Sequence, residues 1–400
     1  MSKHFAVISP PAHGHVNPTL PLVRELTNRG HRVTYPIAEE FRNAVTTAGA
    51  DFLELTPWER PRPQGKVQFT PEMVGMMMEL IARELERNLP TLLARFEDDR
   101  PDVVCYDMMM SAGPILAERL GVPAIQLVPS FASGEGFSLR DELFSDFDMD
   151  HPAITAALDH FREATEAWGV TRPVGGMLTP VIEDLNLVFV PREFQYAGET
   201  FDDRFAFIGP SLSGREDYGD WQPPEPGTRL LFVSLGTAIN NNPDFFKTCV
   251  EAFGGTGWRV AMATGDQVDR DQLGTVPPNF EVRQYFPQPA VLKHATVFAT
   301  HAGMNSTMES LYYEVPTVSA PQMGEQAANA RRAEELGLGR RLPEELTPAA
   351  LRDAVEAVAD DPGIRANLAD MARVLSKAGG ASAGADAVEA MLADRARTTG

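Results

Sequence analysis

Short apolar runs rich in β-branched residues alternate with longer segments of helical pattern in the first half of the chain. The runs FAVIS (5–9), VTYPI (33–37) and DVVCYD (102–107) are accompanied by helical patterns after Asn17 and near 38–48. Short apolar runs of this kind predict buried strands, and strands that alternate with helices predict parallel βαβ units. The pattern therefore predicts an α/β domain with a doubly wound parallel sheet.

The same alternation starts again after residue 228, in the runs LLFVSLG, WRVAMAT, VFATHAG and TVSAP. Between the halves, residues 209–228 are dense in Gly, Pro and charge, which is the composition of an exposed linker. The 400 residues suffice for two domains of ordinary size. We therefore predict an N-terminal domain over 1–208, a linker over 209–228 and a C-terminal domain over 229–400, each Rossmann-like.

The end of the chain has a helical pattern over residues 347–396. The small residues AGGASAGA (378–385) are expected to interrupt it before a final amphipathic helix. That last helix is a candidate to pack back on the N-terminal domain.

Charge and cysteine content narrow the class of protein. The formal net charge is −21 and Lys and Arg form no continuous stripe, which argues against nucleic acid as a partner. Cys105 and Cys249 lie in apolar stretches without a CxxC partner, so we interpret them as buried free thiols. No apolar run approaches the roughly 18 residues that span a membrane, and no charged-then-apolar leader precedes the first strand. These features predict a cytoplasmic protein without a membrane span.

Three predicted strand-to-helix loops have unusual sequences. They are PPAHGHVNP after the first strand, VSLGTA after the strand at 230–234, and THAGMNSTMES after the strand near 296–300. In open parallel sheets, ligands bind outside the carboxyl ends of the strands. Because the loops come from both halves, they predict a ligand cleft between the domains.

The loop after the strand near 296–300 suits a diphosphate. It turns through Gly303 into a helix whose first turn offers residues 305–307, and His301 adds a further donor. Unpaired amides and the positive end of a helix dipole favour such an anion. Glu309 would face a group with two hydroxyls, such as a ribose. The alternative is that residues 305–307 simply cap the helix and Glu309 completes the capping.

A long segment here resembles the donor-binding signature of the UDP-glycosyltransferase family, and most closely that of bacterial macrolide glycosyltransferases. It is YFPQPAVLKHATVFATHAGMNSTMESLYYEVPTVSAPQMGEQAANA, and AHGHVNPTL, RELTNRGHRVTY and VSLGTA extend the likeness over nearly the whole chain. The resemblance implies the GT-B fold, in which two Rossmann-like domains face each other across a cleft. It also implies transfer of a sugar from a nucleotide donor with inversion at the anomeric carbon.

The resemblance further implies roles at the donor site. Tyr285 stands where an aromatic ring stacks on uracil, although plant members usually have Trp there. Gln288 and the Phe286 backbone would contact the base or ribose, and Glu309 the ribose hydroxyls. The remaining donor-site residues would bind the diphosphate (His301, Gly303, Asn305, Ser306 and Thr307, with Thr237 on its β-phosphate side) or the 3- and 4-hydroxyls of the sugar (Glu325 and Gln326).

The first loop contains two histidines, His13 and His15. An HxH pair also suggests a metal, but no Cys or carboxylate lies nearby with ligand spacing, so no metal or other cofactor is expected. In the family the histidine directly before Val-Asn-Pro is the base, which is His15. A hydroxyl needs such a base to become a good nucleophile. A helix N-terminal residue without chemistry is the alternative for His15.

Asp107, at the carboxyl end of DVVCYD, resembles the acid that orients this base in the family. The alternative is that Asp107 caps a helix beginning near Met110. Asp148-Met149-Asp150 matches the metal-holding DxD of a different glycosyltransferase architecture, but its position in an acidic connection favours solvated charge or helix capping.

Methionines cluster near Asp107 and earlier in the chain, and Met can line a cavity that accepts varied apolar shapes. Filling of the core is the alternative. The candidates for the acceptor site are Met76, Met77, Met108, Met109, Phe131 and Phe137.

Taken together, these residues predict transfer of a hexose, glucose from UDP-glucose in the first instance, to a hydroxyl of a hydrophobic small molecule such as a macrolide, another polyketide or a flavonoid. The partners implied are the nucleotide sugar and the acceptor. A TDP-deoxysugar transferase, a sugar-nucleotide epimerase and an inactive homologue that serves as a binding partner remain as alternatives. Glu325 and Gln326 favour a fully hydroxylated sugar, and the presence of both His15 and Asp107 argues against an inactive homologue.

Overall fold

The computed structural model describes residues 2–57, 65–67, 69–145, 147–169, 181–212 and 219–398. It divides into two compact units. Unit 1 comprises Met1–Arg60, Phe69–Ser211 and Ala378–Gly400, and unit 2 comprises Pro61–Gln68 and Leu212–Lys377. The change from unit 1 to unit 2 falls within the predicted linker, whose residues 213–218 lie outside the described ones.

Unit 1 is built on a parallel sheet of seven strands in the order β3-β2-β1-β4-β5-β6-β7. The order of strands along the chain reverses between β1 and β4, and in such sheets ligands bind at this reversal. The register Ile8↔Tyr106 brings the carboxyl ends of these two strands side by side. The strands are β1 (His4–Ile8), β2 (Arg32–Ile37), β3 (Asp51–Glu54), β4 (Val103–Asp107), β5 (Ala124–Val128), β6 (Asn186–Val188) and β7 (Phe205–Phe207).

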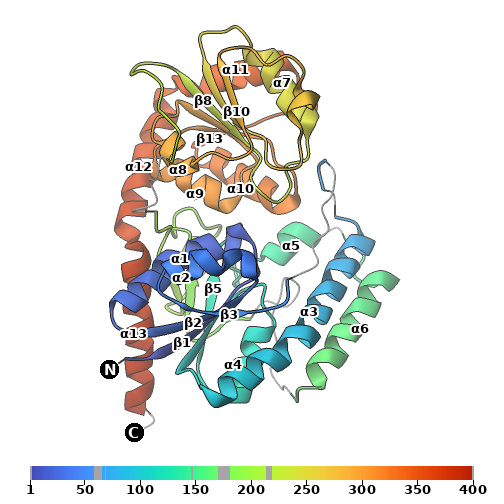
Figure 1. The fold of residues 1–400 in the computed structure, drawn as a ribbon, viewed down its shortest axis with the longest axis vertical. Coiled ribbons are helices and arrows are strands. Elements are labelled where there is room, and N and C mark those ends of the chain that lie inside the picture. Colours follow the sequence, from blue (N-terminus) through green and yellow to red (C-terminus); the bar gives the residue numbers. More distant parts are fainter. Residues whose placement is uncertain are drawn as a thin grey trace. The chain divides into compact units, whose positions relative to one another are not determined.

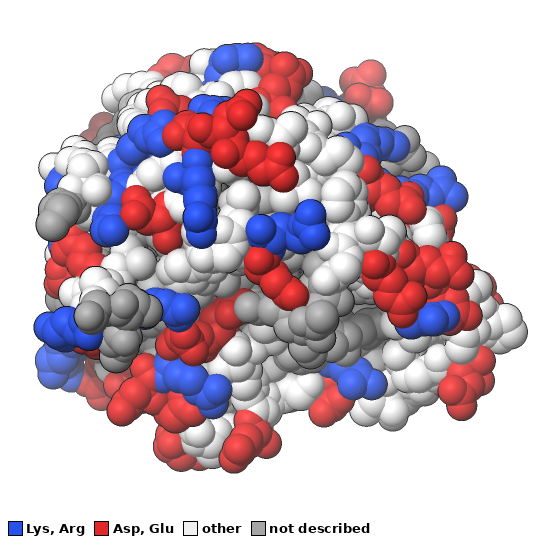
Figure 2. Space-filling model, turned by 90° about the horizontal axis from the view of Figure 1, so that it is seen from below, with Lys and Arg blue, Asp and Glu red and all other residues white. Residues whose placement is uncertain are grey.

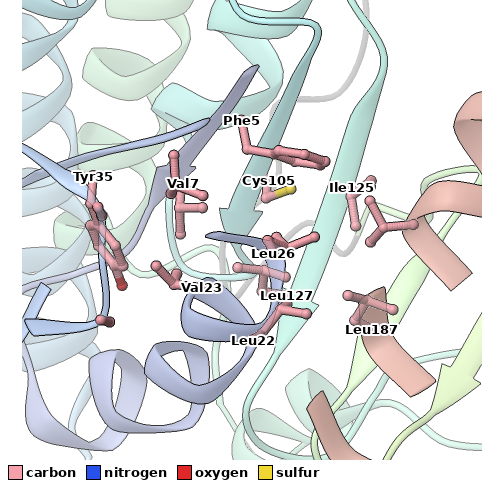
Figure 3. Packing of buried hydrophobic residues seen from close by; sticks show 14 of the residues in the cluster. Phe5, Val7, Leu22, Val23, Leu26, Tyr35, Cys105, Ile125, Leu127 and Leu187 are labelled. Atoms are coloured by element: carbon pink, nitrogen blue, oxygen red, sulfur yellow. The ribbon is translucent and has the colours of Figure 1, made fainter. Parts of the chain in front are cut away.

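Helices cover both faces of this sheet, because alternate residues of each strand point to opposite faces (Figure 1). Phe5 and Val7 of β1 pack into a core with the first and last helices of the chain (Figure 3), whereas Ala6 and Ile8 pack into a second core on the other face. The helices of unit 1 are α1 (His13–Asn28), α2 (Arg42–Thr47), α3 (Pro71–Asp98), α4 (Ala112–Leu120), α5 (Leu139–Phe144), α6 (Pro152–Glu166) and α13 (Gly380–Thr398), with short 3₁₀ turns η1 (Glu39–Phe41) and η2 (Gly198–Thr200).

Helix α13 belongs to unit 1 and packs against α1 (Figure 1). The prediction that AGGASAGA interrupts the helical pattern is correct only at Gly379, since α13 begins at Gly380 and includes the small residues that follow. A methyl group at Gly384 would lie 3.0 Å from Ile208 Cδ1, so a small residue lets the helix lie close to the sheet. Arg29 of α1 adds an ion pair with Asp386, 2.6 Å away.

Unit 2 repeats the architecture with six parallel strands in the order β10-β9-β8-β11-β12-β13, and its strand order reverses between β8 and β11. Two doubly wound parallel sheets confirm the predicted fold class. The strands are β8 (Leu230–Ser234), β9 (Arg259–Ala263), β10 (Phe280–Arg283), β11 (Val297–Thr300), β12 (Thr317–Ser319) and β13 (Gly339–Arg341). The helices are α7 (Pro243–Phe253), α8 (Gln288–Leu292), α9 (Met304–Tyr312), α10 (Gly324–Glu335), α11 (Pro348–Ala359) and α12 (Pro362–Ala378), with the 3₁₀ turn η3 (Arg270–Leu273).

The structure can be compared with the sequence-based predictions about membrane spans, surface charge and cysteines. Within the described ranges, no helix is both long and apolar enough to cross a membrane. On the face drawn in Figure 2, Lys and Arg are interspersed with Asp and Glu and form no stripe. Cys105 and Cys249 are buried and free, as predicted, and burial raises the pKa of the Cys105 thiol to about 12. A thiol with that pKa is inert at neutral pH.

Candidate active site

The first chemical feature of unit 1 is a histidine–aspartate pair at the strand reversal. Asp107 is the last residue of β4, and His15 lies in the first turn of α1, directly after β1. The two side chains meet with His15 Nδ1 2.8 Å from Asp107 Oδ2. Helix α1 begins at His13, four residues before Asn17, because the Ala12 carbonyl already accepts the backbone N–H groups of His15 and Val16. The loop histidines are therefore helical.

Asp107 is completely buried. A buried carboxylate needs hydrogen-bond partners, and besides His15 it has the backbone N–H of Met109, which donates to Oδ1 over 2.9 Å. Helix α4 begins at Ala112 with Ser111 as its N-cap, so the alternative that Asp107 caps this helix is wrong. Met108 N–H donates to the Leu127 carbonyl, which fixes this loop to β5.

This geometry assigns different roles to the two nitrogens of His15. If Nδ1–H donates to Asp107, the basic lone pair lies on Nε2, as in other histidine–acid pairs. His13 is exposed, and its ring lies edge-on to Phe41 at 5.0 Å between centroids. The structure therefore pairs His15 with the buried acid.

The second feature lies in unit 2, where β11 runs through residues 301–303 into α9. The N-cap of α9 is Gly303, which has no side chain to cap with, and Asn305, Ser306 and Thr307 lie within the first helical turn. The alternative in which these residues and Glu309 cap the helix is therefore wrong. The first N–H groups of a helix have no partner within it and bear partial positive charge, so this turn can bind an anion.

His301 precedes this turn, and burial lowers its pKa to about 4, against an opposing hydrogen bond with the Ser234 backbone. The imidazole is neutral at pH 7 as a result. Two glycines flank the ring, because a methyl group at Gly236 would lie 2.6 Å from His301 Nε2 and one at Gly303 would lie 2.5 Å from it. Any side chain at position 236 or 303 would therefore collide with the imidazole ring.

Two residues predicted to contact the nucleoside are joined to each other. Gln288, at the start of α8, donates from Nε2 to Glu309 Oε2 over 2.7 Å and to Ser306 Oγ over 3.1 Å. Glu309 is buried on α9. Tyr285 is 52% exposed, which leaves its ring open to stacking, and Phe286 packs edge-on against Phe232.

The predicted sugar-reading residues lie in the first turn of α10. Glu325 is partly exposed, whereas Gln326 is buried and its Oε1 accepts from the backbone N–H of Gln322 over 2.8 Å. Thr237 is exposed in the loop after β8.

A segment from the first half of the sequence also belongs to unit 2. The Gly65 N–H donates to the Asn241 carbonyl over 2.9 Å, and the Val67 N–H donates to the Gln322 carbonyl over 2.7 Å. These bonds fix the loops that follow β8 and β12. Sequence reasoning missed this segment because it contains no recognisable motif.

The predicted acceptor residues fall into two groups. Met108 and Met109 are partly exposed directly after Asp107, while Met76 and Met77 lie on α3, Met76 being 42% exposed. The second group is aromatic. Phe131 is fully buried behind the partly exposed rings of Phe137 and Tyr196, which stack with 5.0 Å between centroids. Phe137 and Tyr196 therefore form a partly exposed aromatic wall, and Phe131 supports it from behind. Sequence reasoning missed Tyr196.

Among the residues that the structure describes, no three His, Cys, Asp or Glu side chains gather to hold a metal ion. Asp148 and Asp150 are exposed, and Asp148 Oδ1 accepts from the backbone N–H of Asp150 in a turn that precedes α6. This local contact fits the interpretation of the DxD segment as solvated turn-forming charge.

Known proteins resemble the chain over its full length. It is 41% identical to the NDP-glycosyltransferase YjiC of Bacillus licheniformis, over 98% of each chain. The chain belongs to the UDP-glycosyltransferase family. The protein is accordingly a glycosyltransferase, and the predicted family is confirmed.

Further comparisons place this glycosyltransferase near enzymes that act on natural products. It is 33% identical to the oleandomycin glycosyltransferase of Streptomyces antibioticus, over 98% of this chain and 91% of the other. The crystal structure of CalG4, the calicheamicin glycosyltransferase, superimposes with a TM-score of 0.84 at 37% identity and 98% coverage of both chains. Residues 260–379 match the family described as erythromycin biosynthesis protein CIII-like, C-terminal domain.

Proposed function

We propose that this glycosyltransferase moves a hexose, glucose in the first instance, from UDP to a hydroxyl of a hydrophobic natural product, with inversion at the anomeric carbon. The observation that carries the proposal is the contact of His15 with the fully buried Asp107 at the strand reversal of unit 1. A general base oriented in this way is what activation of a hydroxyl requires.

In the proposed reaction, His15 Nε2 takes the proton from the acceptor hydroxyl as the hydroxyl oxygen bonds to the anomeric carbon. The bond from that carbon to the diphosphate oxygen breaks, and UDP leaves with the electron pair. Asp107 stabilises the imidazolium that forms, because its carboxylate accepts a hydrogen bond from Nδ1–H while the proton stays on the ring. A single displacement of this kind converts an α-linked donor into a β-linked product.

Unit 2 would bind the donor. The N–H groups of the first turn of α9, the Asn305, Ser306 and Thr307 side chains and the neutral His301 would hold the diphosphate, with Thr237 at its β-phosphate side. The base would stack on Tyr285, which is exposed enough to receive it. Glu309, already fixed by Gln288, would accept from the ribose hydroxyls, and Glu325 and Gln326 would bind the sugar.

The acceptor would lie against Met77, Met108, Met109 and the aromatic wall of Phe137 and Tyr196, which are partly exposed in unit 1. Met and aromatic side chains provide an adaptable apolar surface, which supports a hydrophobic acceptor. The likeness to the oleandomycin glycosyltransferase and to the calicheamicin glycosyltransferase CalG4 supports the same class.

The decisive experiment incubates the purified protein with UDP-glucose and a panel of macrolides and flavonoids, and detects products by the mass of one added hexose. The proposal expects such products, with a β-anomeric proton coupling by NMR. An α-linked product would contradict the single displacement. A parallel series with TDP-glucose tests which nucleotide the donor carries. A much higher kcat/KM for TDP-glucose than for UDP-glucose would mean that the natural donor is a TDP sugar.

The same assay tests metal dependence. Because the N-terminus of α9 supplies positive potential to the departing diphosphate, we expect the rate to survive excess EDTA. Loss of rate on chelation that Mg²⁺ or Mn²⁺ restores would contradict this expectation.

A further inference from the structure

Two residues on either side of His301 have left-handed backbone conformations. Gly236, in the loop after β8, has φ of 77°, and Ala302, directly after His301, has φ of 61°. For glycine this conformation is unstrained, but for alanine it costs about 1–2 kcal/mol. Ala302 therefore needs contacts that hold it there, since the loop would otherwise relax and carry His301 with it.

Those contacts come from two buried side chains. Asn329, on α10, donates from Nδ2 to the Ala302 carbonyl over 2.9 Å. Thr300, at the end of β11, accepts the Ala302 N–H at Oγ1 over 3.2 Å. Asn329 and Thr300 are both fully buried. The backbone polar groups of Ala302 are thus bonded to side chains and not to a sheet or helix.

The loop on the other side of the ring has a matching contact. Asn240 donates from Nδ2 to the Gly236 carbonyl over 3.0 Å and is also fully buried. A side chain at Gly265 would collide with the Asn240 amide, so this asparagine is held tightly from behind. Each left-handed residue beside His301 therefore has its carbonyl bonded to a buried asparagine.

Stability alone does not explain an asparagine at either position. Within the described part of the chain, no group donates to Oδ1 of Asn240 or Asn329, although both atoms are buried. A buried acceptor without a partner costs about 1–3 kcal/mol, which an apolar side chain of the same size would avoid. The amide groups of these residues are thus retained for the two carbonyls to which they donate.

We propose that Asn240 and Asn329 are positioning residues that hold the Gly236 and Ala302 backbones, and through them the His301 ring, in the arrangement that receives the donor diphosphate. Both asparagines are fully buried, so in this proposal they act through the two backbone carbonyls and not by direct contact with the donor. The inference rests on the proposed role of His301 and the α9 N-terminus in diphosphate binding. It explains how the non-glycine residue Ala302 is kept in its conformation beside that site.

The test measures UDP affinity by calorimetry in folded variants. Asn329→Leu removes the bond to the Ala302 carbonyl, and we expect UDP to bind at least about 10-fold more weakly, the loss of roughly one hydrogen bond to a constrained backbone. Adding Ala302→Gly to this variant should restore affinity to within a few-fold of wild type, because glycine adopts the left-handed conformation without the asparagine. A general loss of packing would not be repaired by removing a methyl group.

Further variants separate the two asparagines and guard against misfolding. Asn240→Leu should also weaken UDP binding, but Ala302→Gly should not rescue it, since the affected residue is Gly236. Thr300→Val serves if Asn329→Leu does not fold, and should likewise be rescued by Ala302→Gly. The matched control is Asn186→Leu, because Asn186 is equally buried and donates to the Glu183 carbonyl in unit 1. It should alter stability and leave UDP affinity unchanged.

The outcomes distinguish this inference from the proposed function. Unchanged UDP affinity in folded Asn329→Leu, or failure of Ala302→Gly to restore it, would overturn the positioning role. If instead wild-type protein does not bind UDP, or His301→Gln binds UDP as well as wild type does, the proposed diphosphate site fails independently of the asparagines.

Discussion

At the scale of single residues, His15 and His301 have opposite environments that suit different tasks. His15 is partly exposed, and its Nδ1 lies 2.8 Å from Oδ2 of the buried Asp107. His301 is enclosed by glycine backbone, and its pKa is lowered to about 4, which keeps it neutral. His15 therefore has a carboxylate partner that can stabilise its imidazolium, whereas His301 takes part in hydrogen bonds without carrying charge at pH 7.

His15→Ala should lower turnover by about 100- to 10,000-fold, the usual effect of removing a general base, and leave UDP affinity unchanged. Steady-state kinetics and calorimetry measure the two quantities. Asp107→Asn should preserve the fold and also slow the reaction, because it removes the charge that stabilises imidazolium. His13→Ala is the control, and turnover that falls more in this variant than in His15→Ala would move the base to His13.

His301 should make the stability of the protein depend on acid pH. Its folded pKa of about 4 lies below the unfolded value of about 6.5, so the unfolded chain takes up the proton first as the pH falls. The contribution of neutral His301 to the free energy of unfolding is therefore complete above pH 6.5. It decreases as the pH falls from 6.5 to 4 and changes no further below pH 4. Urea unfolding across this range should therefore show a smaller loss of stability in His301→Gln than in wild type. Parallel curves would contradict the burial of a neutral ring, and His13→Gln controls for loss of an exposed imidazole.

The sequence indicates the candidate catalytic and binding residues at the ends of strands. It does not indicate residues that only position the backbone of others. His15, Asp107 and His301 lie at the ends of apolar runs, so the rule for parallel sheets places each at the carboxyl edge of its own sheet. Asn240 and Asn329 have no such signal, because their partners are backbone carbonyls far away in sequence or in irregular loops. Their role follows only from the backbone conformation that the structure shows.

At the scale of elements, α3 and α6 pack side by side, and α3 has a glycine where the two helices approach closely. A methyl group at Gly75 would collide with the Ala153 backbone carbonyl, which cannot move without shifting α6. Gly75→Ala should therefore lower the free energy of unfolding by about 1–3 kcal/mol, although alanine favours helix. Gly14→Ala is the matched control, since nothing lies within 4 Å of the added methyl group and the change should be neutral or stabilising. Equal changes in unfolding temperature for Gly75→Ala and Gly14→Ala would mean that α3 and α6 do not approach closely at Gly75.

The elements themselves were predictable to different degrees. Strands such as 230–234 follow directly from apolar runs, because a strand buried on both faces must be apolar throughout. The start of α1 and the continuity of α13 were misjudged. Helix α1 begins at His13 after Ala12, which makes no side-chain cap, so the sequence has no capping signal at its start. The small residues of 380–385 are helical in α13, and Gly384 lies close to Ile208, so tertiary packing overrides the local preference there.

At the scale of the molecule, unit 1 is completed by a helix from the far end of the sequence. Removal of residues 378–400 would uncover the core to which Ala385 and Val388 contribute and break the ion pairs of Arg29 with Asp386 and Glu389. We expect this truncation to lower the unfolding temperature and increase binding of a hydrophobic dye, while unit 2 still binds UDP. Truncation after Ala396, which keeps Ala385 and Val388, is the control. If the truncation of residues 378–400 abolished UDP binding as well as lowering the unfolding temperature, unit 2 would not fold independently of unit 1, and the expectation would be wrong.

The split of unit 1 along the chain also has a consequence for how the protein is made. The ribosome completes all of unit 2 before α13 emerges, and at about 5–20 residues per second this takes on the order of ten seconds. During that interval, the core between α1 and the first sheet lacks the contribution of α13, while the second sheet has every strand it needs. We therefore expect slow translation of unit 2 to lengthen the time for which this apolar surface can aggregate before the last helix arrives.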